Sequence, residues 1–144
     1  MAALAVVVLI AGTRLAAGAT TIGPVTVVAH FGSDAQVLIV LCALGVAAVA
    51  WVGTRTDSHL MAGVAAAAAA GAGVGALAEL RRCVEHWHAS ASRAAAASGY
   101  GQFGAQNRYG HGVELVVAGG VIAIAAAVVL ALAAARRTPP AEPS

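Results

Sequence analysis

Long apolar runs alternate with short polar segments along this chain of 144 residues. Four runs stand out, at about residues 2–18, 35–52, 60–80 and 113–135. A helix needs about 17–25 mostly apolar residues to cross a bilayer, so the pattern predicts four membrane-spanning helices, the first of them barely long enough. No positively charged segment precedes the first run and no clean cleavage site follows it, which favours a short membrane helix over a signal peptide.

The polar connections predict different structures. Residues 19–34 are rich in Thr and Val and are interrupted by Gly23-Pro24, which predicts a short extended hairpin outside the bilayer, or otherwise a loop. Residues 81–98 contain no Pro or Gly, so we expect the third helix to continue past the membrane and to end near Gly99. A glycine- and aromatic-rich exterior loop then reaches residue 112.

Smaller features complete the outline. Residues 53–59 predict a tight connection in which Asp57 or Ser58 can cap the third helix. Two tryptophans, Trp51 and Trp87, are expected to anchor helix ends at the lipid headgroups. Residues 138–144 have the proline-rich composition of a disordered tail.

Composition supports the membrane interpretation. Apolar residues make up 60% of the chain and charged residues 10%, whereas a soluble domain carries about 25% charged residues. The net charge is +2, and the scattered arginines form no stripe of the kind that binds nucleic acid. We therefore predict an all-α integral membrane protein of the plasma membrane. Its fold is a bundle of four transmembrane helices with a short β-like exterior segment and one exterior loop.

Four spans place both termini on the same side of the membrane. A count of basic residues favours exterior termini, because five arginines lie on the opposite side and three on the side of the termini. The minimal middle turn, the two larger connections opposite it and the short basic tail favour cytoplasmic termini, which is the orientation that we adopt. In either orientation four histidines share one side, and only His59 lies on the other. The four are His30, His86, His88 and His111.

The last span opens with Gly110-His111-Gly112-Val113-Glu114-Leu115 and ends at Arg136-Arg137. With a β-like segment after the first helix and a short basic turn between the second and third, this layout resembles a loose class of small actinobacterial four-helix membrane proteins. That class includes the Trp-operon-associated membrane family. The resemblance covers most of the chain and implies a topology, with no activity and no functional residue.

The densest chemistry is the stretch ELRRCVEHWHAS, residues 79–90. On a helix, Glu79, Cys83 and His86 share one face, and Zn²⁺ and Cu favour thiolate and imidazole ligands. A complete site would need histidines from the other connections, which gives the candidate set Cys83, His86, His30 and His111. The alternative, which we favour, is that this stretch is the polar end of an interfacial helix. Both cysteines of the chain are then expected to be free thiols, although one disulfide is possible.

Two carboxylates near the exterior ends of spans, Glu79 and Glu114, are candidates for a proton relay. If the third and fourth helices pack antiparallel, these side chains could approach each other and perturb each other's pKa. The alternative is structural. Glu79 would pair with Arg82 or Arg81, and Glu114 would stabilise the first turn of its helix.

The third run has unusually small side chains, and small faces allow helices in lipid to approach closely. Gly63, Gly71 and Gly75 are its candidate packing residues, the last two with GxxxG spacing. In the following loop, Tyr100, Phe103 and Tyr109 are candidate contacts for a partner, because aromatic residues are enriched at interfaces. Aromatic residues at a membrane surface need no partner, so both interpretations stay open.

These features predict a non-catalytic accessory or structural subunit that packs against a larger membrane complex, for example a respiratory or envelope-transport assembly. No nucleophile motif, phosphate-binding loop or HExxH pattern occurs in the sequence, so we do not expect an enzyme. The first alternative is a metal-handling protein that binds Zn or Cu through its exterior Cys and His residues. The second is a small proton-coupled transporter.

Overall fold

The computed structural model describes residues 1–55, 58–99, 101 and 104–136. These residues form four helices, α1 (Ala2–Arg14), α2 (Ser33–Arg55), α3 (His59–Ala97) and α4 (His111–Arg136). They also form three strands, β1 (Gly18–Ile22), β2 (Val25–Ala29) and β3 (Gln106–Tyr109). The predictions made for Asp57, Tyr100, Phe103, Arg137 and the tail 138–144 lie outside the described residues.

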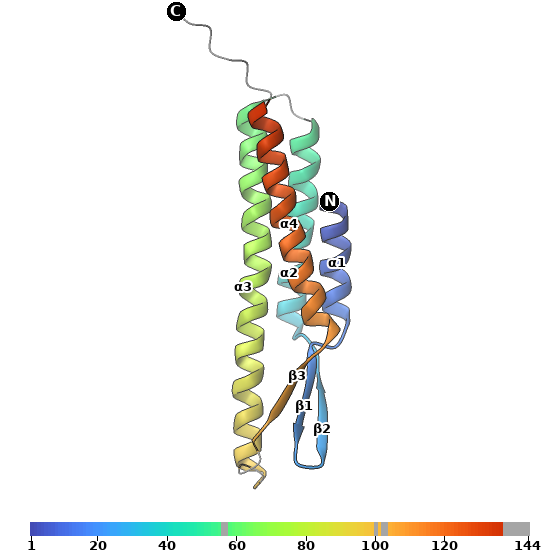
Figure 1. Ribbon diagram of the computed structural model, residues 1–144, viewed down its shortest axis with the longest axis vertical. Coiled ribbons are helices and arrows are strands. Elements are labelled where there is room, and N and C mark those ends of the chain that lie inside the picture. The colour runs from blue at the N-terminus through green and yellow to red at the C-terminus, as the bar shows by residue number, and fades with distance from the viewer. Residues whose placement is uncertain (56–57, 100, 102–103, 137–144) are drawn as a thin grey trace, which may run out of the picture.

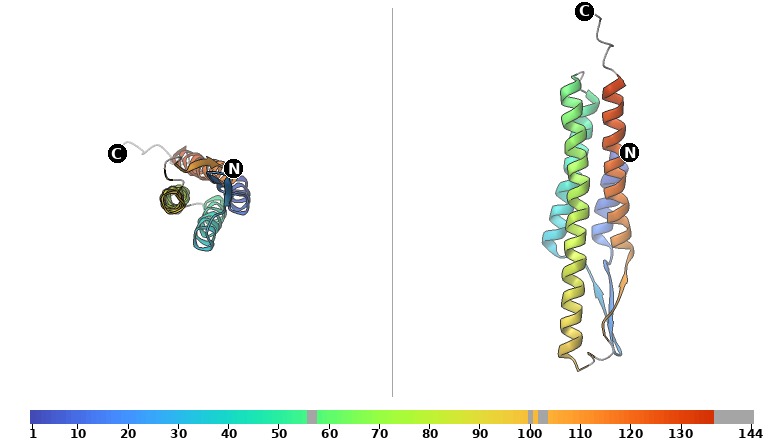
Figure 2. Two further views of the ribbon diagram at one scale, coloured as in Figure 1. Left: turned by 90° about the horizontal axis from the view of Figure 1, so that it is seen from below. Right: turned by 60° about the vertical axis from the view of Figure 1, so that its left-hand side comes forward.

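The four helices pack side by side into an antiparallel bundle (Figures 1 and 2). In this ring, α3 packs between α2 and α4, and α1 packs against both α4 and α2. The strands lie together at one end of the bundle, beside the lower half of α3 (Figure 1). The chain therefore has a helical part and a smaller part in which one helix accompanies a sheet.

The helices α2, α3 and α4 are each long and apolar enough to cross a membrane. Helix α1 is shorter than predicted, with 13 residues, and the fourth span is not confirmed. The backbone leaves the helix at Leu15, which is extended with φ −87° and ψ 162°. Ala17 then joins the sheet, where its N–H donates to Ala29 O at 2.9 Å and its carbonyl accepts from the Gly110 N–H at 2.8 Å. Residues 15–18, which the apolar run predicted to be helical, are therefore extended, because the backbone from Ala17 onward hydrogen-bonds to the neighbouring strands.

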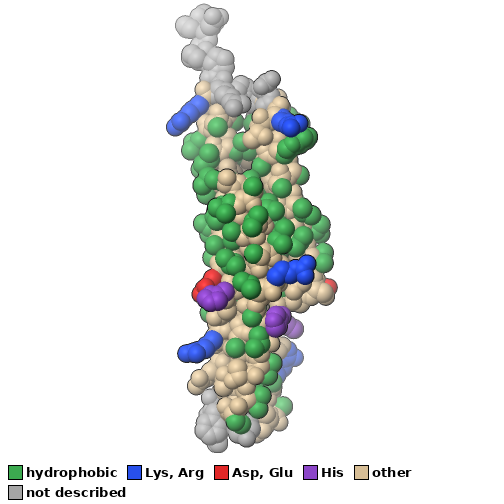
Figure 3. Space-filling model, turned by 90° about the vertical axis from the view of Figure 1, so that its right-hand side faces the viewer, with side chains coloured by type: hydrophobic (Ala, Val, Ile, Leu, Met, Phe, Trp, Pro, Cys, Tyr) green, Lys and Arg blue, Asp and Glu red, His purple; other side chains and the backbone are tan. Residues whose placement is uncertain are grey.

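The outer surface of the bundle is apolar. Figure 3 shows hydrophobic side chains covering the middle of one face, with charged and histidine side chains gathered towards the two ends. Large exposed side chains include Leu41, Leu44, Val121 and Leu132. Apolar side chains are thus spread around the outside rather than kept to a stripe that faces the core, which is the distribution expected of helices in lipid.

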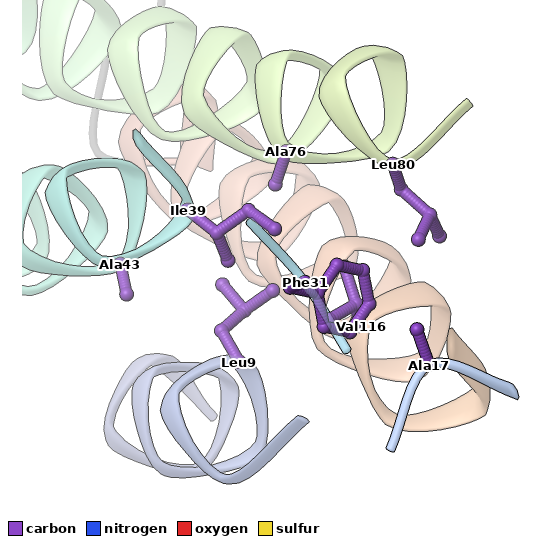
Figure 4. Packing of buried hydrophobic residues seen from close by; sticks show 8 residues of the cluster. All are labelled: Leu9, Ala17, Phe31, Ile39, Ala43, Ala76, Leu80 and Val116. Carbon is purple, nitrogen blue, oxygen red and sulfur yellow. The ribbon is translucent and has the colours of Figure 1, made fainter. Parts of the chain in front are cut away.

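The bundle interior is built from small and branched side chains contributed by every helix. Leu9 of α1, Ile39 of α2 and Val116 of α4 are fully buried and meet near Ala76 of α3 (Figure 4). Phe31, from the segment between β2 and α2, closes this core at the end near the sheet. The same core therefore supports both the helices and the base of the sheet.

The sheet has the order β2-β1-β3 with antiparallel neighbours. The predicted hairpin is confirmed, and Gly23 supplies the positive φ of its two-residue turn, at 56°. Strand β3 was not predicted, because Gln106-Asn107-Arg108 lacks the β-branched residues that mark a strand. It forms because the chain returns from the far end of α3 to α4 alongside β1.

The predicted continuation of the third helix is also confirmed. With 39 residues, α3 is about 58 Å long, roughly twice the thickness of a bilayer's hydrocarbon core. It ends where predicted, since Gly99 follows it with a positive φ of 76°. Its second half, residues 81–97, is called the α3 extension below. Together with the three strands it forms the sheet module.

Candidate functional site

Glu79 is the most buried charged side chain in the part of the chain that the structure describes. Its residue exposure is 7%, although it lies among the polar residues at the start of the α3 extension. The carboxylate accepts a hydrogen bond from the Arg82 guanidinium at 2.9 Å, and the Cys83 sulfur lies 3.8 Å from the same oxygen. The predicted shared face of Glu79 and Cys83 is confirmed, and so is the predicted Glu79–Arg82 pair.

A groove of about 780 Å³ opens beside these residues. One wall is the α3 extension, and the other is the end of the hairpin together with the first turn of α2. His30, Phe31 and Asp34 line the second wall. From α3 come residues on one helical face, among them Glu79, Arg82, Cys83, His86 and Trp87. The groove is therefore lined both by apolar side chains and by charged side chains of both signs.

The structure brings three of the four proposed metal ligands, His30, Cys83 and His86, to this one groove. His111 lies elsewhere, and its Nδ1 is 2.9 Å from the Glu114 carboxylate in the first turn of α4. Across residues 1–55, 58–99, 101 and 104–136, no three His, Cys, Asp or Glu side chains lie close enough to hold one metal ion. The geometry thus lacks the convergent ligand set that a structural zinc site requires.

Both cysteines are free thiols, as predicted. Cys83 lies beyond the predicted span, and burial together with the Glu79 carboxylate raises the pKa of its thiol, although Arg82 acts in the opposite direction. A raised pKa leaves less thiolate at neutral pH, and thiolate is the form that binds metals and attacks electrophiles. Burial and the Glu79 carboxylate therefore disfavour the thiolate form of Cys83.

The two proposed relay carboxylates do not share a partner. Glu79 is paired with Arg82, whereas Glu114 is paired with His111 and its side chain is 67% exposed. The alternative prediction for Glu114, a carboxylate in the first turn of its helix, is confirmed. The structure therefore places an ion pair at Glu79 and a separate His111–Glu114 contact at the other position proposed for a relay.

Trp87 does not have the exposed position expected of a headgroup anchor. Its ring packs on Gly18 of β1, where even a methyl group would overlap it. Its Nε1–H donates to Thr20 Oγ1 at 2.8 Å, and the Thr20 hydroxyl donates to Asn107 Oδ1, also at 2.8 Å. One chain of hydrogen bonds thus joins α3, β1 and β3. It fixes the sheet to the α3 extension.

Aromatic contacts strengthen the same junction. Tyr109 of β3 stacks on the His88 ring at 5.8 Å between centroids and meets the Trp87 ring edge-on at 6.2 Å. Tyr109 nevertheless remains more than half exposed. Its role as a partner contact stays a prediction, and its intramolecular role was not foreseen because the sequence gives no sign of which residues β3 meets.

The predicted packing glycines of α3 face outward or pack loosely. A side chain at Gly63 or Gly71 would meet no atom within 4 Å, and one at Gly75 would meet only Cys42 Sγ, at 3.6 Å. The close approach inside the bundle is made instead by Gly73, where a Cβ would lie 2.9 Å from Ile124 and 3.0 Å from the Gly120 carbonyl. Gly63 and Gly71 are thus left free for contacts outside the bundle.

Comparisons with protein-family models, with curated proteins and with solved structures gave no match.

Proposed function

We propose that this chain is an integral protein of the plasma membrane whose four-helix bundle lies in the bilayer. Helix α2 is about 35 Å long and α4 about 39 Å, which suits a hydrocarbon core of about 30 Å with short polar ends. Arg55 and Arg136 end these helices on one side, and Asp34 and Glu114 begin them on the other. These charges mark two levels that would coincide with the two membrane surfaces.

Helix α1 joins the bundle as a shorter fourth member. At about 20 Å it covers part of the hydrocarbon thickness. Leu9 and Gly12 of α1 are nevertheless buried, and at Gly12 the helix approaches Val116 of α4 closely. In the proposed orientation both termini face the cytoplasm and the sheet module projects from the outer surface. Trp51 then lies at the cytoplasmic surface, with the Arg55 guanidinium 4.4 Å from the centre of its ring.

In this membrane the chain acts as a non-catalytic accessory subunit of a larger complex. The observation that carries the proposal is the surface of the sheet module. Val25, Val27 and Val28 of β2 are each more than half exposed on a part of the chain that projects beyond the bundle. Contiguous exposed apolar residues outside lipid are typical of surfaces that contact another protein. Gly63 and Gly71 offer a second, lipid-facing surface where a partner helix could approach closely.

The proposal is tested by purification from native membranes in a mild detergent, with co-purifying proteins identified and bound metals quantified in the same sample. A partner in fixed stoichiometry, retained through size-exclusion chromatography, is the expected result. A control preparation carries Val25→Ser and Val27→Ser, which should release the partner without changing the amount of chain in the membrane. A stable chain without any partner would refute the accessory role.

The same sample tests the two alternatives. About one equivalent of Zn or Cu, lost on a Cys83→Ala, His86→Ala double change, would establish metal handling. Proton-coupled flux in liposomes, abolished by Glu79→Gln or Glu114→Gln, would establish transport. No contact in the described residues favours either alternative over the accessory role.

A further inference from the structure

Strand β2 has a free edge. In the β1–β2 hairpin, Ile22 faces Val25 across the two-residue turn, so the hydrogen-bonded pairs recur at every second residue, with Val27 opposite Thr20 and Ala29 opposite Gly18. The N–H and C=O groups of the residues between them, Thr26 and Val28, point away from β1. Within the described residues no backbone group pairs with them.

The other edge of the sheet is covered, because β3 lies next to the α3 extension (Figure 1). There Tyr109 contacts the rings of His88 and Trp87. In the part of the chain that the structure describes, nothing covers strand β2 in this way. The strand also lacks the features that usually protect an edge, since it contains no charged residue, no proline and no bulge of its own. Its valines at positions 25, 27 and 28 are 57%, 59% and 54% exposed. The edge thus offers both unpaired backbone groups and apolar side chains.

A second copy of this chain does not fit this edge. Two copies in one membrane are related by a two-fold axis along the membrane normal, and the strands run roughly along that direction (Figure 1). Two β2 strands would then be parallel, with Thr26 of each copy at the same height. In a parallel pair, a residue whose N–H and C=O face the other strand bonds to two residues of that strand, one above and one below its own level. The two strands must therefore be offset by one residue. The two-fold axis forbids that shift, so the symmetric dimer cannot form the ladder.

We propose that β2 accepts a strand from a different protein on the exterior side of the membrane, which extends the sheet to four strands. The partner segment is extended, uncharged and rich in β-branched or other apolar residues. It hydrogen-bonds to Thr26 and Val28 and covers the exposed valines. This inference rests on the proposed accessory role and identifies the part of the partner that the chain recognises.

Proline substitutions at the free edge test the inference directly. Thr26→Pro and Val28→Pro each remove an outward N–H, and proline is tolerated at an edge where the N–H faces away from the sheet. Thr26→Val and Val28→Thr are matched controls that keep the N–H. The valine control also removes the contact between the Thr26 and Thr21 hydroxyls, as proline does. Full-length variants carry a photo-crosslinking amino acid at Val25, are made in cells that naturally contain the chain and are irradiated in intact membranes.

We expect one adduct, mapped to an extended segment of a single protein. Its yield should fall about tenfold or more in the proline variants and change less than twofold in the controls. Amide exchange supplies the second readout. In the complex, Thr26 and Val28 should exchange about tenfold more slowly than in the isolated chain, while Val27, already bonded to β1, changes little. The hairpin is intact in each variant if the Val27 amide stays protected.

Three results would overturn the inference, and they differ in what they say of the accessory role. A partner that co-purifies equally well with the proline variants leaves the accessory role standing and eliminates strand addition. Both the inference and the accessory role are eliminated if the chain purifies from native membranes without any partner and its Thr26 and Val28 amides exchange rapidly. A crosslink from β2 to a second copy of the chain would refute the symmetry argument and the choice of partner.

Discussion

The hydrogen-bond chain from Trp87 through Thr20 to Asn107 should hold the sheet against the α3 extension, and Thr20→Val tests it. Thr20 is nearly buried, and valine replaces its hydroxyl with a methyl group of similar size. The change leaves the Trp87 Nε1–H without its acceptor and Asn107 Oδ1 without its donor. One buried polar group without a partner costs about 1–3 kcal/mol. Opening of the sheet should therefore become about 5- to 150-fold more frequent.

The assay is amide exchange of β1 and β3 in detergent micelles. Thr20→Ser is the control, because it keeps the hydroxyl and removes a methyl group. Indole emission reports the same opening if Trp51→Phe leaves Trp87 as the single tryptophan, since exposure of its ring to water should shift the emission to longer wavelength. We expect faster exchange throughout β1 and β3 in Thr20→Val and unchanged exchange in α4. Exchange in Thr20→Val that matches Thr20→Ser within twofold would show that these hydrogen bonds do not hold the sheet.

Three further predictions follow from the site and the bundle. Gly73→Ala should lower the free energy of unfolding of the isolated chain by about 1–3 kcal/mol through overpacking. Gly71→Ala meets open space and should raise the melting temperature slightly, because alanine favours a helix over glycine; a loss of stability equal to that of Gly73→Ala would contradict the packing. Glu79→Gln removes a negative charge near Cys83, so it should lower the pKa of the Cys83 thiol and speed its alkylation at neutral pH. The pH profile of the alkylation rate measures the shift in pKa, and slower alkylation than in the unchanged chain would contradict the prediction. The purified chain should not retain an equivalent of zinc against a chromophoric chelator, since no third ligand converges on Cys83 and His86 among the described residues; zinc retention that depends on both side chains would refute this.

Features that depend on local pattern could be predicted from the amino-acid sequence alone. Apolar runs about as long as a membrane is thick predicted α2 and α4. The absence of Pro and Gly from residues 81–98 predicted that α3 continues past its apolar run and ends near Gly99. The Thr- and Val-rich segment around Gly23-Pro24 predicted the hairpin. Spacing along one helix likewise predicted the Glu79–Arg82 pair, because residues three apart on a helix are neighbours whatever the fold.

The remaining features could not be predicted in this way, because they depend on which faces of different helices and strands meet. The end of α1 at Arg14 depends on pairing within the sheet, and β3 forms against β1 despite a sequence that is poor in β-branched residues. Trp87 packs under the sheet because Gly18 leaves room for its ring, and Gly73 rather than Gly71 meets α4 because of the rotation of α3 about its axis. Local periodicity gives each element a shape and an apolar face. The angle, register and partner of that face follow only from packing all the elements together.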